Sequence, residues 1–99
     1  MSFDIRFVAS DIRPATLEAA DGETLRRELL ELFDETRLGM PDLLSALERG
    51  AKKGDELTVD ERQAEELFMA IGAASDRAGL TAGLDRLRVA VERYLDPQN

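Results

Sequence analysis

Cysteine and histidine are both absent from this 99-residue chain, and their absence excludes several kinds of chemistry. Without cysteine there are no disulfides and no thiolate nucleophile, and without either residue the usual ligand sets of zinc sites are missing. Histidine is also the side chain that most often transfers protons near neutral pH. We therefore expect a protein that is not an enzyme and that uses no cofactor and no metal ion.

Long apolar runs are absent as well. No stretch approaches the roughly 18 residues that a membrane-spanning helix needs, and the first ten residues lack the basic start and long apolar centre of a secretory signal. We therefore expect a cytoplasmic protein that does not bind membranes. Basic residues are also few, with 13 against 21 acidic ones. Because affinity for phosphate backbones comes mostly from lysine and arginine, direct nucleic-acid binding is not expected.

The first residues have the alternating pattern of a half-buried β-strand. Apolar Phe3, Ile5 and Phe7 alternate with polar side chains between residues 2 and 8, and the side chains of a strand point to opposite faces with a period of two. Residues 15–19 allow two interpretations. They form either a return strand antiparallel to the first one or a short helix that begins at the preceding proline. The chain is therefore predicted to open with a strand or a loose hairpin.

Helical periodicity dominates the remainder of the chain. Four helices are predicted, over residues 23–38, 41–50, 59–78 and 82–96. Turn and capping residues set these bounds: an Asp21-Gly22 turn and a Thr24 cap, Gly39 as a stop, Pro41 as a start, a basic linker from Gly50 to Gly54, a Thr58–Glu61 capping box, Gly79 as a stop and a Thr81 cap. We therefore expect one domain over residues 1–99 with an α+β fold that is mainly α, in which the short N-terminal β-strand or hairpin is followed by about four packed helices.

The helix predicted at 59–78 carries apolar residues on more than one face. Its inward stripe is Ala64, Leu67, Phe68, Ile71, Ala74, Ser75 and Ala78, and a second strip on the far side is formed by Met69, Ala70 and Ala73. The second strip is either covered by other parts of the chain or contacts another protein, because small residues allow close approach and methionine adapts to varied surfaces.

The N-terminal third of the chain resembles a known family. An alternating strand, a return strand and then the segment DGETLRRELLELF, with its Asp-Gly turn and capping threonine, are similar to the opening of ubiquitin-like and sulfur-carrier β-grasp domains. In that family the hairpin leads into a helix that packs across the sheet. The rest of the chain differs, since it predicts helices where the family has further strands and ends in Asp-Pro-Gln-Asn instead of diglycine. The resemblance therefore implies a hairpin followed by a helix, and it implies no activity.

Negative charge is concentrated in the first two thirds of the chain. Residues 1–66 hold 17 acidic and 9 basic side chains, whereas residues 67–99 hold four of each. The acidic density is highest directly before and at the start of the apolar third helix. We predict that this acidic segment and the nearby apolar strip bind a partner through Asp55, Glu56, Asp60, Glu61, Glu65, Glu66, Met69 and Ala73.

Three functional hypotheses are compatible with these patterns. The first is a small, acidic, non-catalytic module of the inhibitor, immunity or adaptor type that binds another protein through a basic surface of that protein. The second is a structural or assembly subunit, such as a homodimer, built through the unpaired edge of the N-terminal strand or through the Met69 face. The third is a carboxylate-dependent magnesium enzyme, because Glu61 and Glu65 lie one helical turn apart and magnesium prefers oxygen ligands. The alternative to all three is that the acidic segment is ordinary solvated surface.

Overall fold

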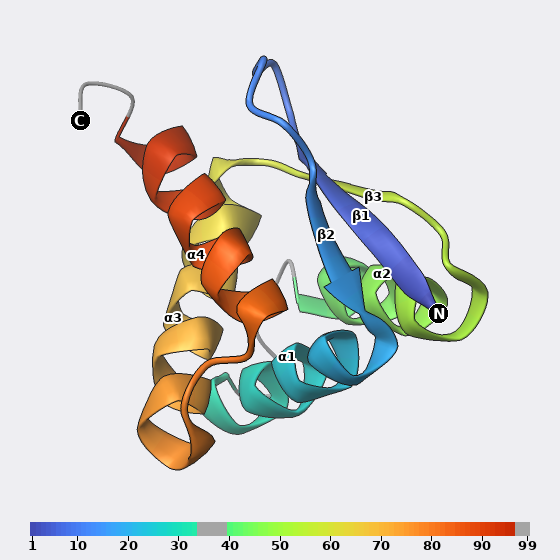
Figure 1. Cartoon of the computed structure of the whole chain (residues 1–99), viewed down its shortest axis with the longest axis vertical. Helices are drawn as coiled ribbons and strands as arrows, with labels where there is room; N and C mark the ends of the chain where they lie inside the picture. Colours follow the sequence, from blue (N-terminus) through green and yellow to red (C-terminus); the bar gives the residue numbers. More distant parts are fainter. Residues whose placement is uncertain (34–39, 97–99) are drawn as a thin grey trace.

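A small sheet with helices packed on one of its faces forms the fold (Figure 1). The computed structural model describes residues 1–33 and 40–96. The elements in chain order are β1 (Ser2–Phe7), β2 (Ala15–Glu18), α1 (Ala19–Leu32), α2 (Met40–Lys53), β3 (Leu57–Val59), α3 (Glu61–Ala78) and α4 (Ala82–Leu95). The predicted fold class is therefore confirmed: the chain is α+β and mainly α, with an N-terminal strand ahead of four helices.

The sheet has the strand order β2-β1-β3. β1 and β2 are antiparallel, with Ile5 opposite Ala15, and β1 and β3 are parallel, with Ile5 opposite Leu57. The return-strand interpretation of residues 15–19 is thus the correct one, and the hairpin followed by a helix that the β-grasp resemblance implies is present. Because β1 has a partner on each side, the prediction of an unpaired edge on the N-terminal strand is wrong.

β3 was not predicted from the sequence, and it displaces the expected start of the third helix. Thr58 lies in this strand, so the Thr58–Glu61 capping box is wrong. The actual box is formed by Asp60 and Gln63: the Gln63 N–H donates to Asp60 Oδ1 at 2.9 Å, and the Asp60 N–H donates to Gln63 Oε1 at 3.0 Å. α3 therefore begins directly after β3 with its own cap.

α1 begins four residues before its predicted start. The Asp21-Gly22 turn is wrong, because both residues lie in the first turns of the helix. The Glu18 N–H donates to Asp21 Oδ2 at 3.2 Å, and Thr24 is an interior residue whose hydroxyl donates to the Ala20 carbonyl. The cap is thus the pair Glu18 and Asp21 and not Thr24. The predicted stop at Gly39 lies outside the described residues.

α2 is longer than predicted at its C-terminal end. The predicted basic linker from Gly50 to Gly54 is wrong, since Gly50, Lys52 and Lys53 belong to the helix. The helix ends at Lys53 and is followed by Gly54, whose φ of 74° is the left-handed conformation that favours glycine. Gly54 also donates its N–H to the Gly50 carbonyl at 2.9 Å.

The side chain of Phe3 explains why Gly22 and Gly50, which were predicted to end or interrupt helices, lie within them. Gly22 of α1 and Gly50 of α2 both lie against the Phe3 ring. A Cβ atom would lie 2.6 Å from the ring at Gly50 and 2.9 Å from it at Gly22. Glycine is needed at these positions because it lets a helix backbone approach an aromatic ring. The Phe3 ring therefore joins the sheet to two helices.

The buried carboxylate of Asp21 links α1 to α4. Asp21 is 5% exposed, and its Oδ1 accepts a hydrogen bond of 2.7 Å from the Thr81 hydroxyl. The Thr81 cap of α4 is confirmed, because Thr81 Oγ1 also accepts from the Leu84 N–H at 3.1 Å. Gly83 lies so close to Asp21 that a Cβ atom there would overlap with its carboxylate. A single side chain thus connects the N-terminal turns of two helices.

α3 and α4 form a helical pair beside the sheet (Figure 1). Gly79 ends α3 as predicted, with a φ of 81°. α3 is also joined to α1, because Arg77 Nε lies 3.1 Å from Oε1 of the buried Glu28 and the same guanidinium contacts Glu31. Within the described residues, no helix combines the length and the apolar character that crossing a membrane requires.

Candidate functional site

The six carboxylates of the predicted acidic segment do not form one patch. Asp55 and Glu56 precede β3, whereas Asp60 and Glu61 follow it, so the strand separates the two groups (Figure 1). Glu56 is also neutralised within the chain, since its Oε2 lies 2.7 Å from Arg6 Nε. Asp55 is exposed. These two residues therefore lie apart from the acids of α3.

Two further carboxylates have structural roles. Asp60 caps α3 through Gln63. Glu66 is 8% exposed, and its Oε1 lies 3.6 Å from Arg62 Nε. Burial raises the pKa of the Glu66 carboxyl, the nearby Arg62 charge lowers this pKa and the Asp60 charge raises it further. Glu66 therefore belongs to the packed side of the helix and not to an exposed acidic surface.

The raised pKa of Glu66 makes a prediction for stability. Because this pKa is higher in the folded chain than in the unfolded one, the folded chain binds more protons between the two values, and stability falls as the pH rises through that window. Glu66→Gln is therefore expected to be more stable than the wild type at pH 7, and the difference is expected to shrink as the pH falls to about 4. Urea unfolding at several pH values measures it. Glu65→Gln, at an exposed neighbouring position, is the control; equal pH profiles for all three proteins would contradict the prediction.

The remaining acids share the exposed face of α3 with two large apolar side chains. Glu61 and Glu65 are exposed, Phe68 is 41% exposed and Met69 is 51% exposed. Residues three and four apart are neighbours on a helix, so these four side chains succeed one another along α3. We call the group formed by Glu61, Glu65, Phe68 and Met69 the α3 surface. Within the described residues, neither Glu61 nor Glu65 has an ion-pair partner.

Several predictions about the sides of α3 are corrected by the structure. Phe68, Ser75 and Ala78, which were predicted to lie on the inward stripe, are exposed. Ala70, which was predicted to lie on the outer strip, is fully buried. Ala73 is half-buried. The inward stripe is thus rotated toward Ala70, and it consists of Ala64, Leu67, Ala70, Ile71 and Ala74. Phe68 was missed because it lies next to Leu67 and because an aromatic residue in an amphipathic helix usually indicates the core.

Two depressions lie on either side of Phe68 between α3 and α4. The larger has a volume of about 620 Å³ and is lined by Phe68, Val89 and Leu95 together with the charged Glu92, Arg93 and Asp96. The smaller has a volume of about 330 Å³ and is bounded by Phe68, Ile71, Gly72 and Leu80, with Ser75, Asp76 and Arg88 beside them. Because Phe68 borders both depressions, we treat them together and call them the α3–α4 furrow.

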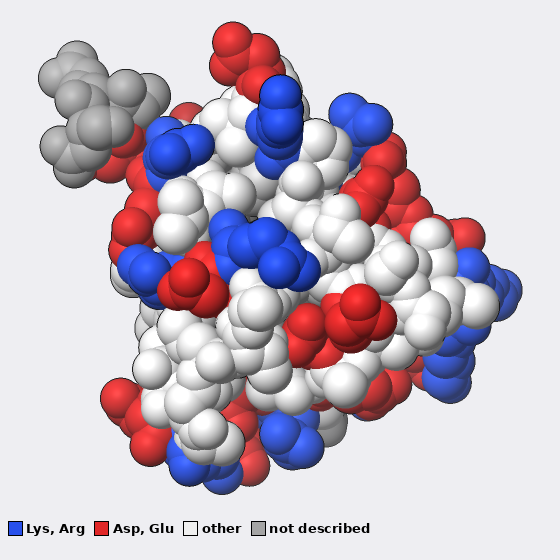
Figure 2. Space-filling model, viewed as in Figure 1, with Lys and Arg blue, Asp and Glu red and all other residues white. Residues whose placement is uncertain are grey.

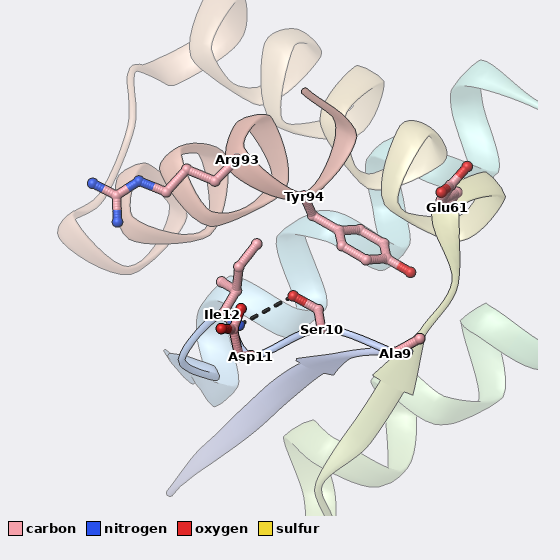
Figure 3. A pocket seen from close by; sticks show the side chains of 7 residues that line it. All are labelled: Ala9, Ser10, Asp11, Ile12, Glu61, Arg93 and Tyr94. Carbon is pink, nitrogen blue, oxygen red and sulfur yellow. Dashed lines mark hydrogen bonds between the residues drawn. The ribbon is translucent and has the colours of Figure 1, made fainter. Parts of the chain in front are cut away.

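A third, more polar depression of about 880 Å³ lies between the β1–β2 loop and the ends of α3 and α4 (Figure 3). Among its seven lining residues, all of them described, one hydrogen bond is present, from the Ile12 N–H to the Ser10 hydroxyl at 3.1 Å. Arg93 and Glu61 point away from each other and away from Ser10 in Figure 3. The polar groups therefore do not converge on a point where a reacting atom would sit.

Tyr94 fixes the start of the β1–β2 loop beside this third depression. Its hydroxyl donates a hydrogen bond of 2.8 Å to the Val8 carbonyl, and its ring centroid lies 5.1 Å from that of Phe7. Burial, followed by the negative charges of Glu61 and Asp60, raises the pKa of the Tyr94 phenol. A phenol with a raised pKa stays protonated at neutral pH, so Tyr94 acts as a tether for the loop.

The described residues also provide no support for the magnesium alternative. In this part of the chain, no group of three or more acidic side chains is arranged so that it could hold a metal ion. Glu61 and Glu65 are two carboxylates on an open helix face, without a third ligand near them.

Charge is mixed over much of the surface. Figure 2 shows acidic and basic side chains interspersed with uncharged surface on one face of the molecule. Charges are also paired within single helices of the described chain, as in Lys52 with Glu48 at 2.7 Å and Arg88 with Asp85 at 2.8 Å. The net charge of −8 is therefore not concentrated in one broad acidic patch on this face.

The described part of the chain has a mainly helical α+β fold. In comparisons with known proteins, no family model matches the chain, and neither a curated protein nor a solved structure matches it significantly.

Proposed function

We propose that this protein is a cytoplasmic, non-catalytic protein-binding module of the inhibitor, immunity or adaptor type, and that the α3 surface contacts a basic region of the partner. The observation that carries the proposal is the juxtaposition of two exposed apolar side chains, Phe68 and Met69, with two exposed carboxylates, Glu61 and Glu65, on one helix. Whether the acids and the apolar residues share an exposed face could not be predicted from the sequence alone.

The composition of the α3 surface is typical of a protein interface. Aromatic residues and methionine are enriched at interface centres, and charged residues are found at the rim. Phe68 and Met69 supply the apolar centre, and Glu61 and Glu65 precede them along the helix. Carboxylates next to an apolar centre steer a basic partner and fix its orientation. Both features support a contact surface in preference to an ordinary solvated helix face.

Reversing the charge of the acidic part tests this proposal. The double variant Glu61→Lys with Glu65→Lys is expected to weaken binding to the partner isolated from the native cell at least about tenfold, or by about 1.4 kcal/mol. It is also expected to reduce the dependence of affinity on salt, because attraction is replaced by repulsion. Titration by isothermal calorimetry at two salt concentrations measures both effects.

A matched control separates this local effect from the change in net charge. The double variant Glu23→Lys with Asp42→Lys makes the same charge change at exposed positions on α1 and α2. Its affinity is expected to change less than about threefold, because screening weakens distant surface charges. Equal losses in the two double variants, or no loss in either, would refute the role of Glu61 and Glu65.

Self-association through Met69 is the alternative use of the same surface. It predicts that the purified chain is a dimer, which light scattering at high micromolar concentration detects. A monomer that binds a second protein supports the proposed function, and a dimer that Met69→Glu dissociates supports self-association.

A further inference from the structure

The α3–α4 furrow combines apolar and charged side chains around the exposed aromatic ring of Phe68. Phe68 separates its two depressions, and aliphatic walls are provided by Ile71 and Leu80 at one end and by Val89 and Leu95 at the other. α4 has 14 residues, so the furrow runs beside a helix about 21 Å long. Amphipathic helices dock on exposed depressions with aliphatic and aromatic walls, with anchors at positions i, i+3 or i+4, and i+7.

Acidic groups outnumber basic ones around the furrow. The carboxylates that line it are those of Asp76, Glu92 and Asp96, and the guanidinium groups that line it are those of Arg88 and Arg93. Arg88 is already engaged within α4, since its Nη2 lies 2.8 Å from Asp85 Oδ1 and its Nη1 lies 3.1 Å from Glu92 Oε1. Together with Asp85, the lining residues carry four negative charges against two positive ones, and this net charge of −2 favours a cationic ligand.

We propose that the α3–α4 furrow binds a basic amphipathic helix of the partner protein, with apolar side chains seated on both sides of Phe68 and lysine or arginine side chains facing the surrounding carboxylates. This inference rests on the proposed function and specifies the partner segment. A helix is favoured over an extended strand because the furrow lies between two helices and offers side chains instead of a row of backbone hydrogen-bond groups.

Gly72 gives the proposal a sharp test. It lies on the wall of the furrow, and nothing lies within 4 Å of the position that a Cβ atom would take there. A longer side chain at this position therefore enters the furrow without clashing with the chain itself. Gly72→Lys is expected to raise the melting temperature, because lysine is a better helix former than glycine, and yet to block the furrow and repel a basic ligand. Stability and binding should thus change in opposite directions.

The probe is a synthetic helical peptide of about 16 residues made of lysine, leucine and alanine, with leucine at positions i, i+3, i+4 and i+7 of each repeat. A second peptide has the same composition in scrambled order. Amide chemical shifts of the labelled protein are followed during titration with each peptide. The expected result is that the amphipathic peptide shifts the signals of α3 and α4, and that the scrambled peptide binds at least about fivefold more weakly.

Three variants are compared in the same titration. Phe68→Ser and Gly72→Lys are each expected to weaken binding of the amphipathic peptide at least about fivefold. Leu30→Ser is the matched control, because Leu30 is 37% exposed on α1 and Phe68 is 41% exposed on α3; it is expected to change binding less than twofold. Circular dichroism confirms that each variant is folded.

The outcomes separate this inference from the function on which it rests. One outcome is that Glu61→Lys with Glu65→Lys weakens binding, whereas Phe68→Ser and Gly72→Lys leave it unchanged. This result would overturn the proposed binding in the furrow but would still support the acidic contact. Signal shifts confined to other elements, or equal affinity for the scrambled peptide, would also overturn the proposed binding in the furrow. A dimer that Phe68→Ser dissociates into monomers overturns it in favour of a second copy of this chain.

Discussion

Gly83→Ala is expected to lower the free energy of unfolding by about 2–3 kcal/mol, although alanine is the better helix former by up to about 1 kcal/mol. The added Cβ atom would overlap with the carboxylate of Asp21. That carboxylate cannot move away freely, because it accepts hydrogen bonds from the Thr81 hydroxyl at 2.7 Å and from the Glu18 N–H at 3.2 Å. Moving it would leave buried polar groups unpaired, which costs about 1–3 kcal/mol.

A double-mutant cycle tests this explanation. In the background of Asp21→Ala, the clash is absent and the other neighbour of the new Cβ atom, Leu17, lies at an ordinary contact distance of 3.5 Å. Gly83→Ala is therefore expected to become stabilising by about 0.5–1 kcal/mol in that background. Urea denaturation of the four proteins measures the cycle. The same loss of stability in both backgrounds would show that the contact with Asp21 does not set the cost.

Phe3→Ala is expected to be more destabilising than Gly83→Ala, with a loss of about 3–5 kcal/mol. The ring is 2% exposed and lies against the backbones of Gly22 and Gly50. Its removal leaves a cavity where the sheet, α1 and α2 meet, and neither glycine has a side chain to fill it. Because domains of this size have a total stability of about 5–15 kcal/mol, a large share is lost.

Two comparisons make the Phe3 prediction specific. Val8→Ala, at a position that is 45% exposed, is expected to cost less than about 0.5 kcal/mol. Gly50→Ala is expected to destabilise the wild type, because the new Cβ atom would stand 2.6 Å from the ring, and to be tolerated once Phe3 is alanine. A small effect of Phe3→Ala, similar to that of Val8→Ala, would contradict the structural role of the ring. Chemical denaturation supplies all of these values.

Local patterns in the sequence were sufficient for much of the fold. The alternation of Phe3, Ile5 and Phe7 predicted β1, and the Thr81 cap with its following apolar stripe predicted α4. Both features depend on side chains close together in the chain, and propensity and capping describe such features well.

The elements that were missed depend on contacts between distant residues. β3 has 3 residues, and its only sequence signal is that Leu57 and Val59 flank Thr58; it is a strand because it pairs in parallel with β1. Gly22 and Gly50 are typical of turns in a sequence, but here they are helix residues that accommodate Phe3. Neither partner is visible in a local window.

The candidate site was predictable only in part for the same reason. The density of acids before and in α3 is a property of the sequence, whereas their division by β3 and the pairing of Glu56 with Arg6 are properties of the fold. The exposure of Phe68 was missed because periodicity indicates the centre of an apolar stripe more reliably than its edge.

The central claim is that the α3 surface contacts another protein, and site-specific photocrosslinking in the native cell tests it most directly. A benzophenone amino acid is placed at position 69 and, in a matched control, at position 30, which is also an exposed apolar position. We predict one discrete crosslinked product from position 69, lost when Glu61 and Glu65 are both replaced by lysine, and none from position 30. The absence of a product at position 69, or the same products from both positions, would contradict the claim.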